Sequence, residues 1–207
     1  MPERRTYDTA GRRAAATRNR DAVLHACRDL VLANGYRATT VKAVADRAGV
    51  SAETVYKGFG GKKQLMKAVY DITLAGDTEP VPIGRRPAIK AAIDATDPAD
   101  KIRLYAHAIG ELLARISRLV AVLAEADPEI AEIRAATEDE RLAGVRQFVA
   151  HLAESGALRP GADVDLAADA CWALTAPAMF TQLTATRGWS QKTYEDWLAR
   201  TLSATLI

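Results

Sequence analysis

Long apolar runs are missing from the 207-residue sequence, and no stretch approaches the roughly 18–20 residues that cross a bilayer. The basic N-terminus is not followed by the apolar segment of a secretory signal. The only cysteines, Cys27 and Cys171, are too few for a disulfide framework, so we expect free, buried thiols. The sequence therefore predicts a cytoplasmic protein that has no part in a membrane.

Signatures of catalysis and of metal binding are missing as well. The three histidines are isolated along the chain and lack the spacing of metal ligands. The glycine-rich segment 58–63 resembles a phosphate-binding loop, but Tyr56 stands where such a loop needs glycine and Lys63 where it needs serine or threonine. We therefore expect no metal, no cofactor and no enzymatic activity.

Charge is distributed unevenly along the chain. Residues 1–63 hold 13 Lys and Arg against 6 Asp and Glu, a net charge of +7, whereas the remainder carries −5. Hydrophobic residues make up 49% of the chain and charged residues 26%, as in ordinary globular proteins. A basic first third beside an acidic remainder suits one part that binds a polyanion and another that does not.

The composition predicts an all-α fold. Ala, Leu, Arg and Glu dominate, and no run of alternating β-branched residues is long enough for a sheet. We expect a basic flexible arm at 1–17, a first helical domain at 18–75 and a second helical domain at 76–207.

Local signals mark where helices begin and end in the first half. Thr40 and Ser51 are typical N-caps of two short helices, and Gly49 separates these helices. Gly35 ends the preceding helix, and a longer helix is expected over 62–75.

The second half begins with a loop over 76–87. Helices are expected at 98–125 and 128–154, then at 164–187 with a kink at Pro177, and finally from Ser190 onward.

The two short helices predict a helix-turn-helix, in which the first helix braces the second and the second lies in a major groove. One set of side chains is apolar and packs the helices together: Val41, Val44, Ala45, Val50 and Val55. Another set is small, hydroxylic or charged and faces outward: Lys42, Ser51, Ala52, Glu53, Thr54, Tyr56 and Lys57. Groups of the second kind hydrogen-bond phosphates and base edges.

Residues 18–71 resemble the DNA-binding domain of the TetR family of transcriptional regulators. The resemblance rests on ANGY, ATTV, AxxAGVS, TVYxxF and KKQL, read in that order along the chain. It implies that Thr40 and Tyr56 contact phosphates through their hydroxyls and that Lys62 binds a phosphate at the start of its helix. It also implies that five residues meet base edges or the nearby backbone: Lys42, Ala52, Glu53, Thr54 and Lys57.

One position departs from the family pattern. Many members carry His or an aromatic residue directly before the phenylalanine of TVYxxF, where this chain has Gly58. We therefore expect that contact with the DNA backbone to be absent, and the junction with Gly60 and Gly61 to be loose. The arginines of the N-terminal arm either reach the DNA or belong to a solvated tail.

The second half resembles one subgroup of these regulators in three segments: GALRPGADVD, AADACWALTAPAMF and RGWS. The resemblance implies a ligand-binding and dimerisation domain, with a cavity within 87–187 and a homodimer formed through the last two helices. Dimer contacts are favoured for Trp197, Leu198 and Leu202, with internal core as the alternative. An apolar or aromatic effector would meet residues that also suit a helical core: Tyr105, His107, Trp172, Met179 and Phe180.

The function implied is a ligand-responsive repressor that binds a palindromic double-stranded DNA operator as a dimer and is released by a small molecule. A helical carrier or interaction module would lack a groove-reading helix, whereas residues 51–57 have the character of one. A regulator that senses a protein partner, or nothing, stays open.

Overall fold

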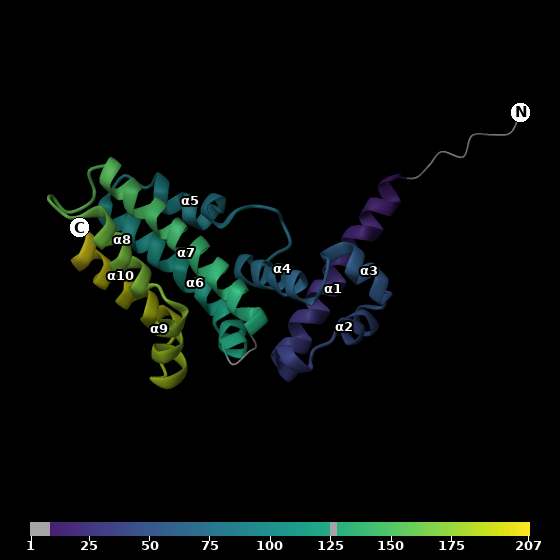
Figure 1. Ribbon diagram of the computed structural model, residues 1–207. Coiled ribbons are helices and arrows are strands. Elements are labelled where there is room, and N and C mark those ends of the chain that lie inside the picture. The colour runs from purple at the N-terminus through teal and green to yellow at the C-terminus, as the bar shows by residue number, and fades with distance from the viewer. Residues whose placement is uncertain (1–8, 125–127) are drawn as a thin grey trace, which may run out of the picture. The chain divides into compact units, whose positions relative to one another are not determined.

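A computed structural model of the chain describes residues 9–124 and 128–207. The described residues are helical, with no strand among them, so the predicted all-α fold is confirmed (Figure 1). The first four helices are α1 (Thr9–Ala38), α2 (Val41–Ala48), α3 (Ala52–Phe59) and α4 (Lys62–Ala75). The others are α5 (Pro87–Asp94), α6 (Pro98–Ala124), α7 (Pro128–Glu154), α8 (Val164–Leu174), α9 (Pro177–Thr181) and α10 (Gln191–Leu206).

The chain forms two compact units, which divide between Ile72 and Thr73, inside α4. This division lies just before the boundary expected after residue 75. No described helix of either unit is long and apolar enough to cross a membrane.

The core of the N-terminal unit is built on one face of α1. Val23, Leu24, Cys27 and Val31 recur at helical spacing, and all four side chains are buried. Helices α1 and α2 pack together, and α2 packs on α3. Gly35 interrupts α1 with φ +80°, where the sequence predicts its end.

Part of the N-terminal arm expected over residues 1–17 is helical in the structure. Residues 1–8, and with them Arg4 and Arg5, lie outside the described residues, but α1 already begins at Thr9. The expectation of a flexible arm is therefore wrong for residues 9–17. These residues include the run Ala14–Ala16, and alanine has the strongest intrinsic preference for a helix.

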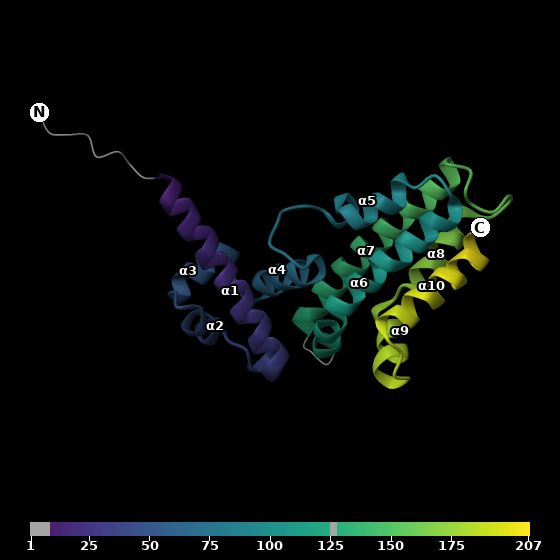
Figure 2. The same cartoon turned by 180° about the vertical axis from the view of Figure 1, so that it is seen from behind.

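Helix α6 is the centre of the C-terminal unit. It packs against α5, α9 and α10, while α8 packs against α7 and α10 (Figure 2). Tyr105 of α6 stacks on Phe148 of α7 with 3.7 Å between ring centroids and 4° between ring planes. The helices expected over 98–125 and 128–154 are present as α6 and α7.

Two elements of this unit differ from the predictions. A 3₁₀ turn at Ile83–Arg85 lies inside the loop expected over 76–87, and α5 follows it in a stretch for which the sequence predicts no element. The helix expected over 164–187 is interrupted rather than kinked, because α8 ends at Leu174 and Pro177 starts α9 as its first residue. Ala176 is extended, the conformation favoured before proline, and a π-helical turn follows at Gln182–Thr186.

The last helix packs inside its own chain. Leu198 and Leu202 of α10 are fully buried within the unit, as is Tyr194. The intersubunit contacts favoured for Leu198 and Leu202 are therefore wrong, because their side chains already belong to the core. Trp197, on a neighbouring stripe of α10, is half-buried.

Both cysteines are buried, and burial raises the pKa of each thiol to about 12. We expect neither thiol to react with a disulfide reagent at pH 8 in the native protein, since roughly one thiol in ten thousand is then ionised. Both should react once the protein is unfolded in denaturant. Rapid labelling of the native protein would contradict the burial.

The raised pKa also sets a pH dependence of stability. In the unfolded chain the thiols ionise near 9.0, whereas in the folded protein they stay protonated to about 12. Their contribution to stability is therefore complete below pH 9 and decreases as the pH rises toward 12.

Candidate nucleic-acid interface

Local hydrogen bonds define both helices of the helix-turn-helix. The Ala43 N–H donates to Thr40 Oγ1 at 3.0 Å, and the Thr54 N–H donates to Ser51 Oγ at 3.1 Å. Gly49, between the helices, has φ +69°, a conformation that glycine adopts without strain. Both predicted caps and the predicted turn are confirmed. Helix α3 continues to Phe59.

One face of the motif is packed and the other is open. Val55 of α3 is fully buried, and Val44 and Ala45 of α2 are 1% exposed. The apolar set predicted to join these helices is therefore buried, except for Val50, which is half-buried. Seven of the nine predicted DNA-binding residues are exposed: Thr40, Lys42, Ser51, Glu53, Thr54, Tyr56 and Lys57. The other two, Ala52 and Lys62, are half-buried.

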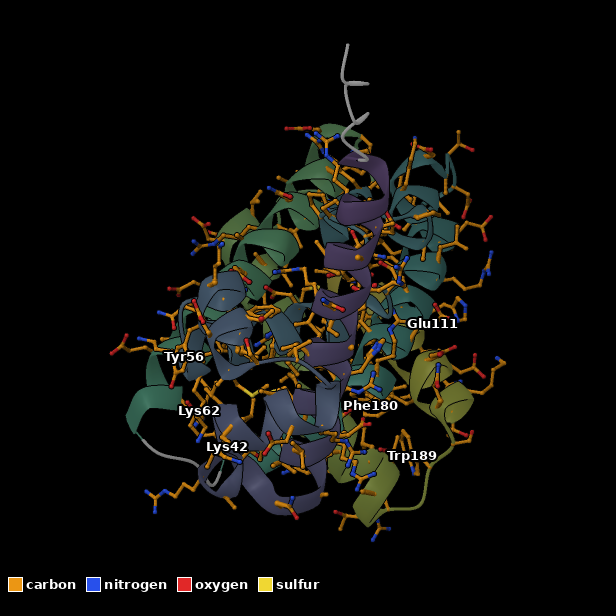
Figure 3. All side chains as sticks on the ribbon, turned by 90° about the vertical axis from the view of Figure 1, so that its right-hand side faces the viewer. Lys42, Tyr56, Lys62, Glu111, Phe180 and Trp189 are labelled. Carbon is orange, nitrogen blue, oxygen red and sulfur yellow. The ribbon has the colours of Figure 1, made fainter. Side chains whose placement is uncertain are left out.

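Three of the predicted residues present groups that suit phosphate oxygens. Tyr56 is 54% exposed although its ring is large and apolar. Lys42 donates to Asp46 Oδ2 at 2.8 Å, and this hydrogen bond raises the pKa of its ammonium. Figure 3 labels Tyr56, Lys62 and Lys42 along one edge of the N-terminal unit.

Lys62 is held in place by residues that the sequence does not single out. Its Nζ lies 3.9 Å from the centroid of the Tyr36 ring and donates to the Arg37 carbonyl oxygen at 3.5 Å. These contacts join the first turn of α4 to the end of α1. They keep the lysine half-buried and orient its ammonium before any ligand is bound.

A second cation lies against the end of α3. The guanidinium carbon of Arg20 lies 4.6 Å from the centroid of the Phe59 ring. The sequence gives no local signal for this pair, because its members are separated by 38 intervening residues.

The glycine-rich junction at the end of α3 contains Gly58, Gly60 and Gly61. Gly60 has φ +85°, and its N–H donates to the Tyr56 carbonyl oxygen, which closes α3. Gly58 lies within α3, and a Cβ atom there would meet nothing within 4 Å. The missing side chain at Gly58 therefore leaves open space on the helix.

In the C-terminal unit, the predicted effector residues differ in their surroundings. Tyr105 is buried and hydrogen-bonded to the Cys171 thiol, and burial raises the pKa of its phenol. Phe180 packs edge-on against Tyr194, with 4.9 Å between ring centroids. His107 is exposed, and its Nδ1 lies 2.8 Å from Glu195 Oε2.

Trp172 lies beside a cation that the sequence does not single out. The Arg141 guanidinium carbon is 4.4 Å from the centroid of the Trp172 ring, and Arg141 also donates to the Trp172 carbonyl oxygen at 2.7 Å. Glu138 accepts two further N–H groups of Arg141. The indole N–H of Trp172 is buried and finds no hydrogen-bond partner among the described residues. Met179 is half-buried on α9.

The geometry of residues 39–71 agrees with a known sequence family. The profile of the bacterial regulatory proteins of the tetR family matches residues 23–69, which include all of α2 and α3. Residues 23–69 therefore form a DNA-binding domain of the tetR family.

Two HTH-type transcriptional regulators resemble about a quarter of this chain. The HTH-type transcriptional regulator AlkX of Mycobacterium tuberculosis is 43% identical over 56 residues, which cover 27% of this chain and 26% of that protein. YvkB of Bacillus subtilis, an uncharacterized HTH-type transcriptional regulator, is 40% identical over 47 residues, 23% of this chain and 25% of that protein. The chain thus matches about a quarter of the length of these relatives.

Solved structures share the fold over nearly the whole chain. NalD of Pseudomonas aeruginosa superposes with a TM-score of 0.72 at 20% identity, over 93% of this chain and 98% of NalD. FadR of Bacillus subtilis gives 0.69 at 18% identity, over 90% of this chain and 98% of FadR. The C-terminal unit therefore has the fold of tetR-type regulators despite little sequence similarity.

Proposed function

We propose that this protein is a ligand-responsive transcriptional regulator, a repressor that binds a palindromic DNA operator as a homodimer and leaves it when a small molecule binds. Residues 18–75 would bind DNA in the cytoplasm, and residues 76–207 would bind the effector and form the dimer. The observation that carries this proposal is α3, a short capped helix that is buried on Val55 and exposed on Glu53, Thr54 and Lys57.

The electrostatics of the N-terminal unit support DNA as the partner. Lys62 stands at the N-terminus of α4, where the backbone N–H groups of the first turn and the helix dipole favour a phosphate. Tyr56 and Thr40 add exposed hydroxyls, which donate to phosphate oxygens without reading sequence. The side chains at the start of α3 are small, so the helix can approach base edges.

The proposed dimer uses the outer faces of α8 and α10, which belong to the last two helices expected from the sequence. Leu166 of α8 is 69% exposed and Val164 is 41% exposed, which is unusual for large aliphatic side chains. Trp197 and Thr201 of α10 are half-buried on the stripe beside the internal core. A two-fold interface of this kind would present two copies of α3 to the two halves of an operator.

The proposed effector is apolar or aromatic. Two structural neighbours were solved with ligands that have a large apolar or aromatic part. FadR of Bacillus subtilis was solved with stearoyl-CoA and SmeT with triclosan. Tyr105, Trp172, Met179 and Phe180 are the candidates for apolar contacts. The buried N–H of Trp172 has no acceptor in the described part of the chain, and an acceptor on the effector would remove the cost of burying it.

A direct contact links α6 to α4 within the C-terminal unit. Arg115 Nε donates to the Leu74 carbonyl oxygen at 3.1 Å, in the last turn of α4. A Cβ atom at Gly76 would come within 3.1 Å of Arg115 Cδ, so the chain passes close to this side chain. An effector that shifts α6 would move α4 through this contact, and releasing DNA requires only that the effector prefers the shifted state.

Selection of bound duplexes from a random DNA library tests this function. We expect enrichment of two inverted half-sites, about one helical turn apart or somewhat more. Recovery of unrelated sequences at the frequency of the starting library would refute specific DNA binding.

Thr54→Ala should change sequence discrimination rather than overall affinity. The Thr54 hydroxyl is exposed and lies 2.9 Å from Ser51 Oγ, at the start of α3. Removal of one base contact costs about 1–3 kcal/mol of discrimination, so repeated selection should relax one position in each half-site. Thr54→Ser keeps the hydroxyl and serves as the control. An unchanged preferred sequence for Thr54→Ala would show that Thr54 does not read a base.

A further inference from the structure

The first part of α1 extends beyond the core of its unit. Val23 is the first buried residue of the helix, although the helix begins at Thr9. Side chains are described for residue 11 and residues 13–20, and none of them is buried; only Ala15 is even half-buried. Figures 1 and 2 both show α1 continuing past α2 and α3 toward the N-terminus. More than two turns of helix thus precede the first side chain described as buried.

Residues 9–20, the part of α1 that precedes this core, are strongly basic. They contain Arg12, Arg13, Arg18 and Arg20 and no acidic residue. The first turn of α1 likewise carries no acidic side chain to complement the helix dipole. An isolated helix of this length is marginal in water, and cations near its N-terminus weaken it further. A polyanion beside the helix would offset both the repulsion among its arginines and the unfavourable interaction of these cations with the helix dipole.

The side chains of residues 9–20 indicate which kind of polyanion would bind there. The apolar side chains are alanines, which give too little apolar surface for a helix that lies in a membrane interface. The segment is instead continuous with the candidate DNA interface, because Arg20 at its end lies over the Phe59 ring at the end of α3.

Helical periodicity places two of the arginines toward α3. Arg13 and Arg20 fall on the stripe that continues, farther along α1, as the buried residues Leu24, Cys27 and Val31. Arg13 and Arg20 are roughly 10 Å apart along the helix axis, so they would meet different phosphates of a DNA strand.

We propose that residues 9–20 form a second DNA contact, in which the helix lies along the phosphate backbone beside the site read by α3. This proposal rests on the proposed function. The second contact adds affinity and salt sensitivity but carries no base readout, because arginines on phosphates position a protein without reading sequence.

The test compares the full-length wild-type protein with a variant that carries Arg12→Gln, Arg13→Gln and Arg18→Gln, and leaves Arg20 on Phe59. Binding to the selected operator is measured at several salt concentrations. We expect the slope of log K against log salt to decrease by about 0.9 for each phosphate that the variant no longer neutralises, and affinity at low salt to fall about tenfold or more. The sequence preferred in selection should stay the same.

A matched control replaces three exposed arginines of the C-terminal unit by glutamine: Arg103, Arg134 and Arg146. It removes the same charge and should leave the salt slope nearly unchanged. If the N-terminal variant and this control behave alike while wild type binds its operator, the second contact is refuted and the helix-turn-helix proposal stands. If wild type selects no DNA, the proposed function fails first and the second contact fails with it.

Discussion

The double variant Tyr56→Phe/Lys62→Met is expected to bind DNA about 100-fold more weakly, or worse, for every sequence alike. Each change removes one hydrogen bond to a charged phosphate, which contributes about 1.5–3 kcal/mol, and separate contacts add approximately. The salt slope should decrease by about 0.9, because only Lys62 displaces a counterion. Fluorescence anisotropy with operator and random duplexes measures both quantities.

The choice of methionine at position 62 follows from the structure. The Lys62 side chain lies over the Tyr36 ring, so methionine keeps much of the packing and removes only the charge. Lys90→Met, at an exposed lysine of α5, is the control for removal of a cation. Thermal unfolding should show that all variants stay folded. An altered sequence preference with unchanged overall affinity would contradict the phosphate assignment.

Gly110→Ala is expected to destabilise the C-terminal unit by about 1–3 kcal/mol, the usual cost of overpacking. Gly110 is buried in α6 where α10 packs on it, and a Cβ atom there would clash with Glu195 Cγ and lie 2.9 Å from its Cδ. Glu195 has little freedom to move away, since His107 and Gln191 each hydrogen-bond its carboxylate. Thermal and urea unfolding measure the decrease in stability.

Gly144→Ala is the matched control for this prediction. Gly144 is exposed within α7, and a Cβ atom there meets nothing within 4 Å. Alanine in the helix interior should stabilise the protein by roughly 0.5–1 kcal/mol. The two substitutions are therefore expected to have opposite signs. A Gly110→Ala protein as stable as wild type would show that α6 and α10 tolerate a wider separation.

The helix-turn-helix can be predicted from the sequence because its signals are local. Each cap and turn depends on residues within four positions, as for Thr40 with Ala43 and Ser51 with Thr54. Resemblance to a family adds roles for these side chains, but not their surroundings. The Tyr36 ring beneath Lys62 and the Arg20 guanidinium beside Phe59 are contacts between distant parts of the chain, which periodicity does not reveal.

Predictions for the second half are weaker for a physical reason. Helical periodicity shows which face of α10 is apolar, but does not show whether another helix of the same chain or a second subunit covers it. The sequence favours dimer contacts for Leu198 and Leu202, whereas both belong to the internal core. The break between α8 and α9 is likewise more complete than the sequence predicts, because Pro177 permits either a kink or a new helix start.

Chemical interference on the selected operator tests the central claim, that α3 reads DNA from the major groove. Methylation of guanine N7 and replacement of thymine by uracil both alter only the major-groove edge of a base pair. We predict that these changes block binding at two clusters, about one helical turn apart or somewhat more. Full binding to DNA modified at every such position in both half-sites would contradict the claim.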